Sequence, residues 1–388
     1  MKWTLQGDVI DSTYRKKISN FVLTTKRFTQ DIMVKKFETN FAKWSGSKYS
    51  LFVSSGSTAN LLLIDSMREK YGWSDDAEII VPAVTWTTNV SPIIQLGMKP
   101  VFCDINLEDL SFDYDMLVKV ISKKTKAIFI THLIGLPADI NQIKNICEDK
   151  GIKVIEDCCE ALGAKIANKK VGTFGDGGTF SFYWGHHMTS IEGGMVITND
   201  KELFHIMRMK RSHGMARALP ESEWDDIKNK NMDNDFRFLF LTLGYNFRSS
   251  EINAFIGNLQ LAELEEIIKK RNSNYDYFLK IISKYNNLKA IKKDGMSSFS
   301  FPLIFDDENQ KKIALTLLEK SNIESRPLIS GNLLRHPAFS KYKGNASFKN
   351  ADKLHACALY LGNHQFVTKQ NLKVLDKVLE EVVSSANH

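Results

Sequence analysis

The chain has 388 residues, of which 43% are hydrophobic and 25% charged, and a formal net charge of +7. This length and composition exclude a disordered chain and suffice for a large hydrophobic core with a second, smaller domain. The longest apolar runs, such as Ile79 to Val84, are far shorter than a membrane span, and no apolar leader follows the first residues. We therefore expect a cytoplasmic protein with no membrane partner.

The positive charge is spread along the chain. A typical basic run, Lys269 to Arg271, stands among acidic neighbours in a helical pattern. This setting favours a solvated helix face over a nucleic-acid site, because no recognition motif accompanies the run. We expect no nucleic-acid partner, whereas a basic balance suits an anionic small molecule.

The five cysteines are odd in number and most stand in apolar, strand-like context, which indicates free buried thiols. Their spacing matches neither a zinc site nor an iron–sulfur cluster, so we expect no metal. They are Cys103, Cys147, Cys158, Cys159 and Cys357.

Strand-like runs alternate with helical patterns through the first two thirds of the chain, which is typical of a parallel sheet with crossover helices. The predicted strands are residues 50–53, 79–81, 99–104, 127–132, 153–156, 178–182 and 194–198. The predicted helices are residues 57–71, 140–150 and 201–210, and residues 251–281 have the apolar spacing of one or two long helices.

The pattern changes after Lys292. Residues 297–305 alternate like a strand, 309–320 are amphipathic, 323–329 are extended and 371–383 are helical. We expect a large α/β domain in residues 1–250, followed by linking helices and a small α+β domain in residues 251–388. No Pro/Gly/Ser-rich linker separates them, so the domains are expected to pack tightly.

A candidate phosphate seat lies in residues 54–61 (SSGSTANL), after a predicted strand and at the start of a predicted helix. The glycine permits a tight turn, and backbone N–H groups at a helix N-terminus bind anions. A simple Ser/Thr helix cap is the alternative and is more common for such a motif alone.

Two further segments end at the carboxyl edge of the predicted sheet, where α/β proteins bind ligands. Residues 81–86 (VPAVTW) place Trp86 there, either to stack on a flat heterocycle or to fill the core. Residues 154–163 (VIEDCCEALG) place Asp157 there. A carboxylate in this place can keep a pyridine nitrogen protonated, as in pyridoxal phosphate (PLP) enzymes, and a helix cap is the alternative.

The order of these motifs, together with GTFGD (172–176), the segment from Thr179 to Gly194, RSHGM (211–215) and GYNFR (244–248), resembles the sugar aminotransferases of the DegT/DnrJ/EryC1/StrS family. The resemblance covers nearly the whole chain. It implies the α/β fold of fold-type I PLP-dependent aminotransferases, with a large, mostly parallel seven-stranded sheet domain and a smaller C-terminal α+β domain.

The chain departs from that family at two positions. His186 replaces the lysine that joins the cofactor, and Glu160 replaces the usual glutamine. With residues 326–332 (RPLISGN) and 361–365 (LGNHQ), these departures resemble a subgroup that removes the C3 hydroxyl of a GDP-linked 4-keto-6-deoxy sugar. An imidazole cannot displace an amino sugar from the cofactor as lysine does, but it can move protons near neutral pH. We expect His186 to take a proton from cofactor C4′ and to protonate the leaving hydroxyl.

The resemblance also implies partners and a setting. The cofactor would be PLP and its pyridoxamine form (PMP), regenerated by L-glutamate, and the products would be a 3-deoxy-4-keto sugar and ammonia. The sugar would be a mannose derivative or a heptose analogue, used to make the dideoxysugars of surface lipopolysaccharide or capsule. The enzyme would be a homodimer with shared active sites.

The resemblance assigns residues by motif position. Cofactor contacts fall on Gly56, Ser57, Trp86, Asp157, Glu160, Ser181 and, from the neighbouring subunit, Asn246. Substrate contacts fall on Lys26, Arg27, Phe28, Thr29, Arg217, Arg248 and Arg326, with His213 near the donor carboxylate. Arginine suits diphosphate and carboxylate groups because of its fork of donors. His187 has no catalytic role in this interpretation.

Three alternatives stay open. A related dehydratase acts on a CDP-sugar with an iron–sulfur cluster and a reductase, but the cysteines lack the spacing for that cluster. The chain could instead be an aminotransferase in which another group replaces the lysine. It could also be an inactive homologue that serves as a sensor or scaffold, although Trp86, Asp157 and the phosphate seat are retained.

Overall fold

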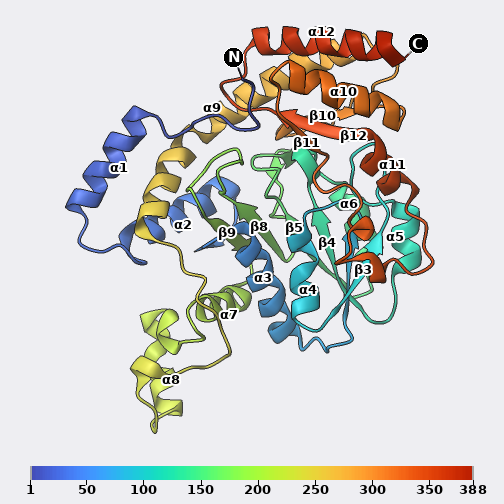
Figure 1. Cartoon of the computed structure of the whole chain (residues 1–388). Helices are drawn as coiled ribbons and strands as arrows, with labels where there is room; N and C mark the ends of the chain where they lie inside the picture. Colours follow the sequence, from blue (N-terminus) through green and yellow to red (C-terminus); the bar gives the residue numbers. More distant parts are fainter. Residues whose placement is uncertain (1, 387–388) are drawn as a thin grey trace.

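The computed structural model describes residues 2–386 and is built around a seven-stranded sheet with the strand order β1-β9-β8-β5-β4-β2-β3 (Figure 1). All seven strands predicted from the sequence are present in it. Only β9 runs antiparallel to its neighbours, β1 and β8. The strands are β1 (Tyr49–Val53), β2 (Glu78–Pro82), β3 (Lys99–Cys103), β4 (Thr125–Thr131), β5 (Lys153–Asp157), β8 (Gly177–Ser181) and β9 (Gly194–Thr198).

Helices cover this sheet, which explains why its central strands are apolar without alternation. In β5, every residue after Lys153 is buried, and in β8 all five are. The covering helices are α3 (Gly56–Tyr71), α4 (Ser91–Gln95), α5 (Tyr114–Val120), α6 (Ile140–Cys147) and α7 (Lys201–Arg211). The three predicted helices are α3, α6 and α7. α6 ends three residues early, because the chain turns at Asp149, where φ is 62°.

Two helices that the sequence analysis did not predict precede the sheet, α1 (Ser12–Thr24) and α2 (Ile32–Ser45). α2 buries Val34, Phe37 and Phe41 in a cluster that includes residues of α9 (Glu251–Ile282). α9 is one helix of 32 residues and therefore satisfies the prediction for residues 251–281. α9 lies close against α2 at Gly257, since a Cβ there would lie only 2.7 Å from the Phe37 ring. A glycine at this position allows the two helices to pack together.

The interpretation of Lys269 to Arg271 as a solvated helix face is wrong for one of its three residues. Lys269 and Lys270 are exposed, but Arg271 is only 1% exposed. The reason is the helical period, since Arg271 shares the inward face of α9 with Ile267, Ile268 and Asn274.

The C-terminal part packs helices on a three-stranded antiparallel sheet, in the order β10-β12-β11. The predicted strand in 297–305, helix in 309–320, extended segment in 323–329 and helix in 371–383 are all present, whereas β12 was not predicted. The elements are β10 (Ser300–Ile304), α10 (Glu308–Lys320), β11 (Ser325–Pro327), α11 (Lys349–Cys357), β12 (Ala358–Gly362) and α12 (Lys369–Ala386). The domain boundary after residue 250 stays a prediction.

A short hairpin of β6 (Lys165–Ile166) and β7 (Lys169–Lys170) precedes β8, and an arm with α8 (Trp224–Lys230) projects from the body (Figure 1). Four of the five cysteines are buried and all are free, as predicted. Within residues 2–386, no helix is long and apolar enough to cross a membrane.

Candidate active site

The predicted cofactor residues come together at the carboxyl edge of the large sheet. Trp86 follows β2, Asp157 ends β5, Ser181 ends β8, and Gly56 begins the helix that follows β1. Because β9 is antiparallel to β8, the loop of residues 182–193 that carries His186 also lies at this edge. The sheet topology thus gathers on one edge five segments that are distant in sequence.

Asp157 is a buried carboxylate whose partners are all uncharged. Its Oδ2 accepts a hydrogen bond of 2.9 Å from Asn60 Nδ2, and its Oδ1 accepts one of 2.9 Å from the Cys159 amide. No Lys, Arg or His among the described residues forms an ion pair with it. The helix-cap alternative is wrong, because residues 158–164 form turns and no helix. A buried carboxylate without a cation fits a protonated pyridine ring.

Gly56 lies directly against Ser181 and Cys159. A Cβ at position 56 would lie 2.7 Å from Ser181 Cβ and 3.2 Å from Cys159 Sγ. The helix-cap alternative for this segment is confirmed at Ser55, which accepts from the Thr58 amide in a capping box, whereas Ser57 is not the cap. The Ser57 side chain is exposed beside the first backbone N–H groups of α3, which have no acceptor within the helix. This arrangement fits a phosphate group.

Trp86 is 53% exposed, so the core alternative for this residue is wrong. An indole exposed at the ligand-binding edge of the sheet is available to stack on a flat ring.

Glu160 lies beside Asp157 and accepts a hydrogen bond of 2.8 Å from the Ile134 amide. Burial and the nearby Asp157 carboxylate raise the pKa of Glu160 to about 8, although the Ile134 hydrogen bond acts in the opposite direction. Glu160 is therefore mainly protonated at neutral pH, and a protonated carboxyl group can donate a hydrogen bond. This explains physically how a glutamate can stand where the family has a glutamine.

His186 is half-buried in the loop between β8 and β9, and its ring lies 5.5 Å from the Phe299 ring, centroid to centroid. Among the described residues, its Nδ1 has no hydrogen-bond partner. Burial, and then the nearby charge of Arg271, lower the pKa of His186 to about 4, with a backbone hydrogen bond at Cys159 opposing the shift. The imidazole is uncharged at neutral pH and can accept a proton.

His187 differs from its neighbour. It is fully buried, and its Nε2 lies 3.2 Å from the Ser297 hydroxyl. Burial is also the main reason why its pKa lies well below the usual value. These contacts favour a structural role, in line with the prediction that His187 is not catalytic.

The predicted substrate residues form two groups and two isolated residues. Arg248 Nε donates to Asn246 Oδ1 at 3.0 Å, and its Nη2 lies 3.3 Å from His213 Nε2. The exposed loop with Lys26, Arg27, Phe28 and Thr29 is joined to the segment after Arg248, because Thr29 forms an isolated β-bridge with Ser250. Arg217 is exposed on the arm, and Arg326 pairs with Glu324 at 3.0 Å.

None of the hydrogen bonds or ion pairs within residues 2–386 connects these substrate candidates to Asp157 or His186. Their assignment therefore stays a prediction.

Three residues at the site were not predicted. Asn60 orients Asp157, and it lies one helical turn after Gly56, a spacing that could have revealed it. Arg271 contacts the loop of His186, but its place in a basic run gave no such signal. Tyr360, in β12, is the third, and burial and the nearby Glu160 raise its pKa to about 12.

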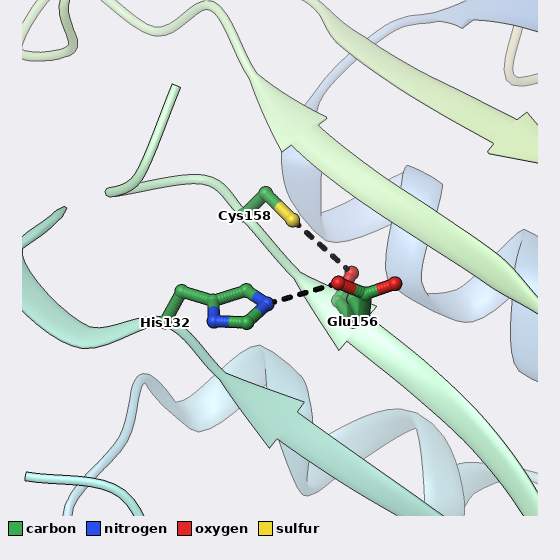
Figure 2. Close-up of side chains that lie close together, drawn as sticks. All are labelled: His132, Glu156 and Cys158. Carbon is green, nitrogen blue, oxygen red and sulfur yellow. Dashed lines mark hydrogen bonds and ion pairs between the residues drawn. The ribbon is translucent and has the colours of Figure 1, made fainter. Parts of the chain in front are cut away.

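A buried cluster of His132, Glu156 and Cys158 lies beside this site, with its possible ligand atoms within 4.8 Å of one another (Figure 2). His132 Nδ1 accepts from the Ala138 amide at 3.0 Å, so its Nε2 carries the proton and donates to Glu156 Oε2 at 3.1 Å. The Glu156 carboxylate also accepts three backbone amides, from Gly172, Phe174 and Gly175. Since His132 and Glu156 are fully engaged, the cluster is a hydrogen-bond hub and does not suit a metal ion.

The class of protein follows from this fold and site together with comparison to known proteins. Residues 10–381 match the DegT/DnrJ/EryC1/StrS aminotransferase family, and the chain belongs to that family. Its fold is that of the fold-type I PLP-dependent aminotransferases, as the sequence predicts.

The relatives narrow the class. A GDP-4-keto-6-deoxy-D-mannose 3-dehydratase from Escherichia coli O55:H7 is 37% identical, over 98% of this chain and 100% of the relative. A solved structure of the E. coli enzyme with bound hydrated PLP has a TM-score of 0.90 and 34% identity, and the match covers 98% and 99% of the two chains. Another, of a GDP-4-keto-6-deoxymannose-3-dehydratase with a trapped PLP-glutamate geminal diamine, has a TM-score of 0.89 and 34% identity, over 97% and 100%.

Proposed function

We propose that this protein is a PLP-dependent dehydratase that removes the C3 hydroxyl of GDP-4-keto-6-deoxymannose, or of a heptose analogue, with L-glutamate as amino donor. One observation carries the proposal: His186 stands at the position of the cofactor lysine, its ring is uncharged, and its Nδ1 has no partner within residues 2–386. The similarity to dehydratases over nearly the full length of both chains supports it.

The fixed residues of the site bind and orient the cofactor. Bound PLP supplies an electron sink, and its amine form, PMP, supplies the nitrogen that reacts with the sugar ketone. Asp157, held by Asn60, would pair with the pyridine nitrogen and stabilise its protonated form. Gly56, Ser57 and Ser181 would hold the phosphate, Trp86 would stack on the ring, and Glu160 would line the pocket as a hydrogen-bond donor.

His186 moves the proton. Its uncharged ring would accept a proton from cofactor C4′, and the same ring would then donate it to the oxygen that leaves sugar C3. An imidazole has no primary amine, so His186 cannot displace an amino sugar from the cofactor as lysine would. The substitution therefore directs the site towards loss of the hydroxyl.

The overall reaction balances without a further reductant. The sugar loses one oxygen atom from C3, glutamate becomes α-ketoglutarate, and nitrogen leaves as ammonia. The oxygen that the sugar loses equals the one that glutamate gains on becoming the keto acid, with exchange through water. The spacing of the five cysteines matches no iron–sulfur cluster, and the proposed reaction needs no iron–sulfur reductase.

The substrate is held by groups outside this core. Arg217, Arg248 and Arg326 are proposed to bind the GDP diphosphate or the glutamate carboxylates, with His213 near the donor carboxylate. The loop with Lys26, Arg27, Phe28 and Thr29 is proposed to complete the substrate site.

A homodimer with shared active sites is part of this proposal, with Asn246 reaching the partner's cofactor phosphate. Asn246 is exposed, as that role requires. Large apolar side chains are also exposed on the arm, namely Met232, Phe238, Phe240 and Leu243, with Leu243 89% exposed. Exposed apolar surface of this kind marks an interaction site.

The proposal is tested by assaying purified protein with PLP, L-glutamate and GDP-4-keto-6-deoxymannose. We expect ammonia and α-ketoglutarate to form in equal amounts, with a His186→Asn variant as the inactive control. Dehydration that continues in His186→Asn contradicts the role of His186, and α-ketoglutarate without ammonia points to an aminotransferase.

A further inference from the structure

Arg271 is a buried cation without an anionic partner. It is 1% exposed, and no carboxylate among the described residues lies within ion-pair distance of it. A buried guanidinium is costly to keep unless its donors are satisfied. Burial lowers the pKa of Arg271 to about 9, so it remains charged at neutral pH.

The partners of this guanidinium are oxygen atoms of the segments around His186. Nη2 donates to the His186 carbonyl at 3.1 Å and to Gln6 Oε1 at 3.4 Å, and Nη1 donates to the Phe299 carbonyl at 3.1 Å. Gln6 Nε2 donates to the same His186 carbonyl at 3.4 Å. The rings of His186 and Phe299 lie against each other. Arg271 thus joins α9, the N-terminal segment and the segment before β10 to one peptide group of the loop.

We propose that Arg271 is a positioning residue for His186: it holds the loop that carries the imidazole and supplies the positive charge that faces it. The inference rests on the proposed function, in which His186 must be uncharged to accept a proton. We do not assign Arg271 to the cofactor or the substrate, because its Nη1 and Nη2 donate to backbone and amide oxygens and the residue is 1% exposed.

The other groups around His186 do not replace this charge. Among the described residues that the structure places against His186, the titratable ones besides Arg271 are Tyr183 and His187 on its own loop and Cys159 after β5, while Gln6 and Phe299 themselves carry no charge. Burial raises the pKa of the Cys159 thiol well above its usual value, so Cys159 is uncharged. Burial and then the positive charge of Arg271 also lower the pKa of His187 and of His364. The charge of Arg271 therefore acts on all three histidines.

The inference is tested by offsetting the positive charge near His186 in two ways, with an added carboxylate beside Arg271 and with removal of Arg271 itself. Gln6→Glu places a carboxylate next to Nη2 and leaves Arg271 in place, and Gln6→Leu is the matched control without charge. Arg271→Gln removes the cation, and Arg271→Lys keeps it. All four variants are studied with PLP bound, by NMR titration of the labelled His186 ring and by the acid limb of kcat/KM.

We expect Gln6→Glu and Arg271→Gln to raise the pKa of His186 by about one unit. Each change offsets or removes the positive charge of Arg271, which disfavours the protonated imidazole over several ångströms at an effective dielectric constant of about 20. The acid limb of kcat/KM should move with it, and Gln6→Leu and Arg271→Lys should titrate like the parent protein. In Arg271→Lys, the ammonium group cannot reproduce the paired Nη1 and Nη2 hydrogen bonds that position the His186 loop. This loss should lower kcat about tenfold, while KM for the GDP-sugar changes less than about twofold.

An unchanged titration of His186 in both Gln6→Glu and Arg271→Gln overturns the inference. If Arg271→Gln does not fold, the comparison of Gln6→Glu with Gln6→Leu decides the question. Gln6 is only half-buried, so we expect both of its variants to fold. A shifted titration in a protein that does not dehydrate the sugar keeps this inference and removes the proposed function.

Discussion

Replacement of Glu156 by glutamine tests the hydrogen-bond hub that supports the active-site edge of the sheet. Glu156 is fully buried, and each of its two oxygens accepts two hydrogen bonds: Oε1 from the amides of Phe174 and Gly175, and Oε2 from the amide of Gly172 and from His132 Nε2. Burial raises the pKa of Glu156, but these hydrogen bonds outweigh it and lower the pKa overall. The native carboxylate is therefore charged at neutral pH.

The magnitude follows from the number of donors left without an acceptor. A glutamine presents one oxygen and one NH₂ group, so in either orientation two donors face an NH₂. His132 cannot compensate by changing its tautomer, because its Nδ1 already accepts from Ala138. With about 1.5–3 kcal/mol for each hydrogen bond to a charged group, Glu156→Gln should lower the free energy of unfolding by about 3–6 kcal/mol.

The assay is urea unfolding at neutral pH and fixed protein concentration, followed by circular dichroism. The matched control is Glu308→Gln, which makes the same chemical change at an exposed carboxylate paired only with Lys312 on the surface of α10. The control should change stability by no more than about 0.5 kcal/mol. A loss below about 1 kcal/mol in Glu156→Gln would refute the argument that four donors converge on a carboxylate.

Three further predictions concern the site. Gly56→Ala should weaken PLP binding by about 1–3 kcal/mol, because the new Cβ would lie 2.7 Å from Ser181 Cβ and overpack the site. Absorbance titration measures the affinity, and an unaltered affinity would contradict the close approach. His186→Lys should suppress dehydration and give amino sugar, measured by ammonia release; full dehydration would contradict the role of the imidazole. Burial and then Arg271 lower the pKa of His186 and of His364 to about 4, so the unfolded chain protonates first. Stability should therefore fall as the pH drops from about 6.5 to about 4, by up to about 1.4 kcal/mol per pH unit for each histidine, whereas urea melts that are flat over this range would contradict it.

The central sheet could be predicted because its strands are short apolar runs between turns, and burial on both faces makes such runs continuous. The same reasoning explains why the candidate cofactor residues Trp86, Asp157 and Ser181 lie together, since each stands at or just after the carboxyl end of a strand of this sheet. Val34, Phe37 and Phe41 recur at helical spacing, so the sequence also contains a signal for α2.

Arg271 could not be predicted because its burial depends on the packing of four segments distant in sequence, and local charge pattern favours the surface. β12 is one strand of an antiparallel sheet whose partners lie about 35 and 57 residues earlier, and it directly follows the last residue of α11, so no turn signal separates the two. The roles of the exposed substrate candidates could not be tested, because within residues 2–386 of a single chain no hydrogen bond or ion pair connects them to Asp157 or His186.

Dehydration and transamination are distinguished by the mass spectrum of the sugar nucleotide formed from GDP-4-keto-6-deoxymannose with PLP and L-glutamate, compared with CDP-linked and heptose substrates. The account predicts a GDP-linked product lighter than the substrate by one oxygen atom. A product that retains the C3 hydroxyl and carries an amino group at C4 would contradict it.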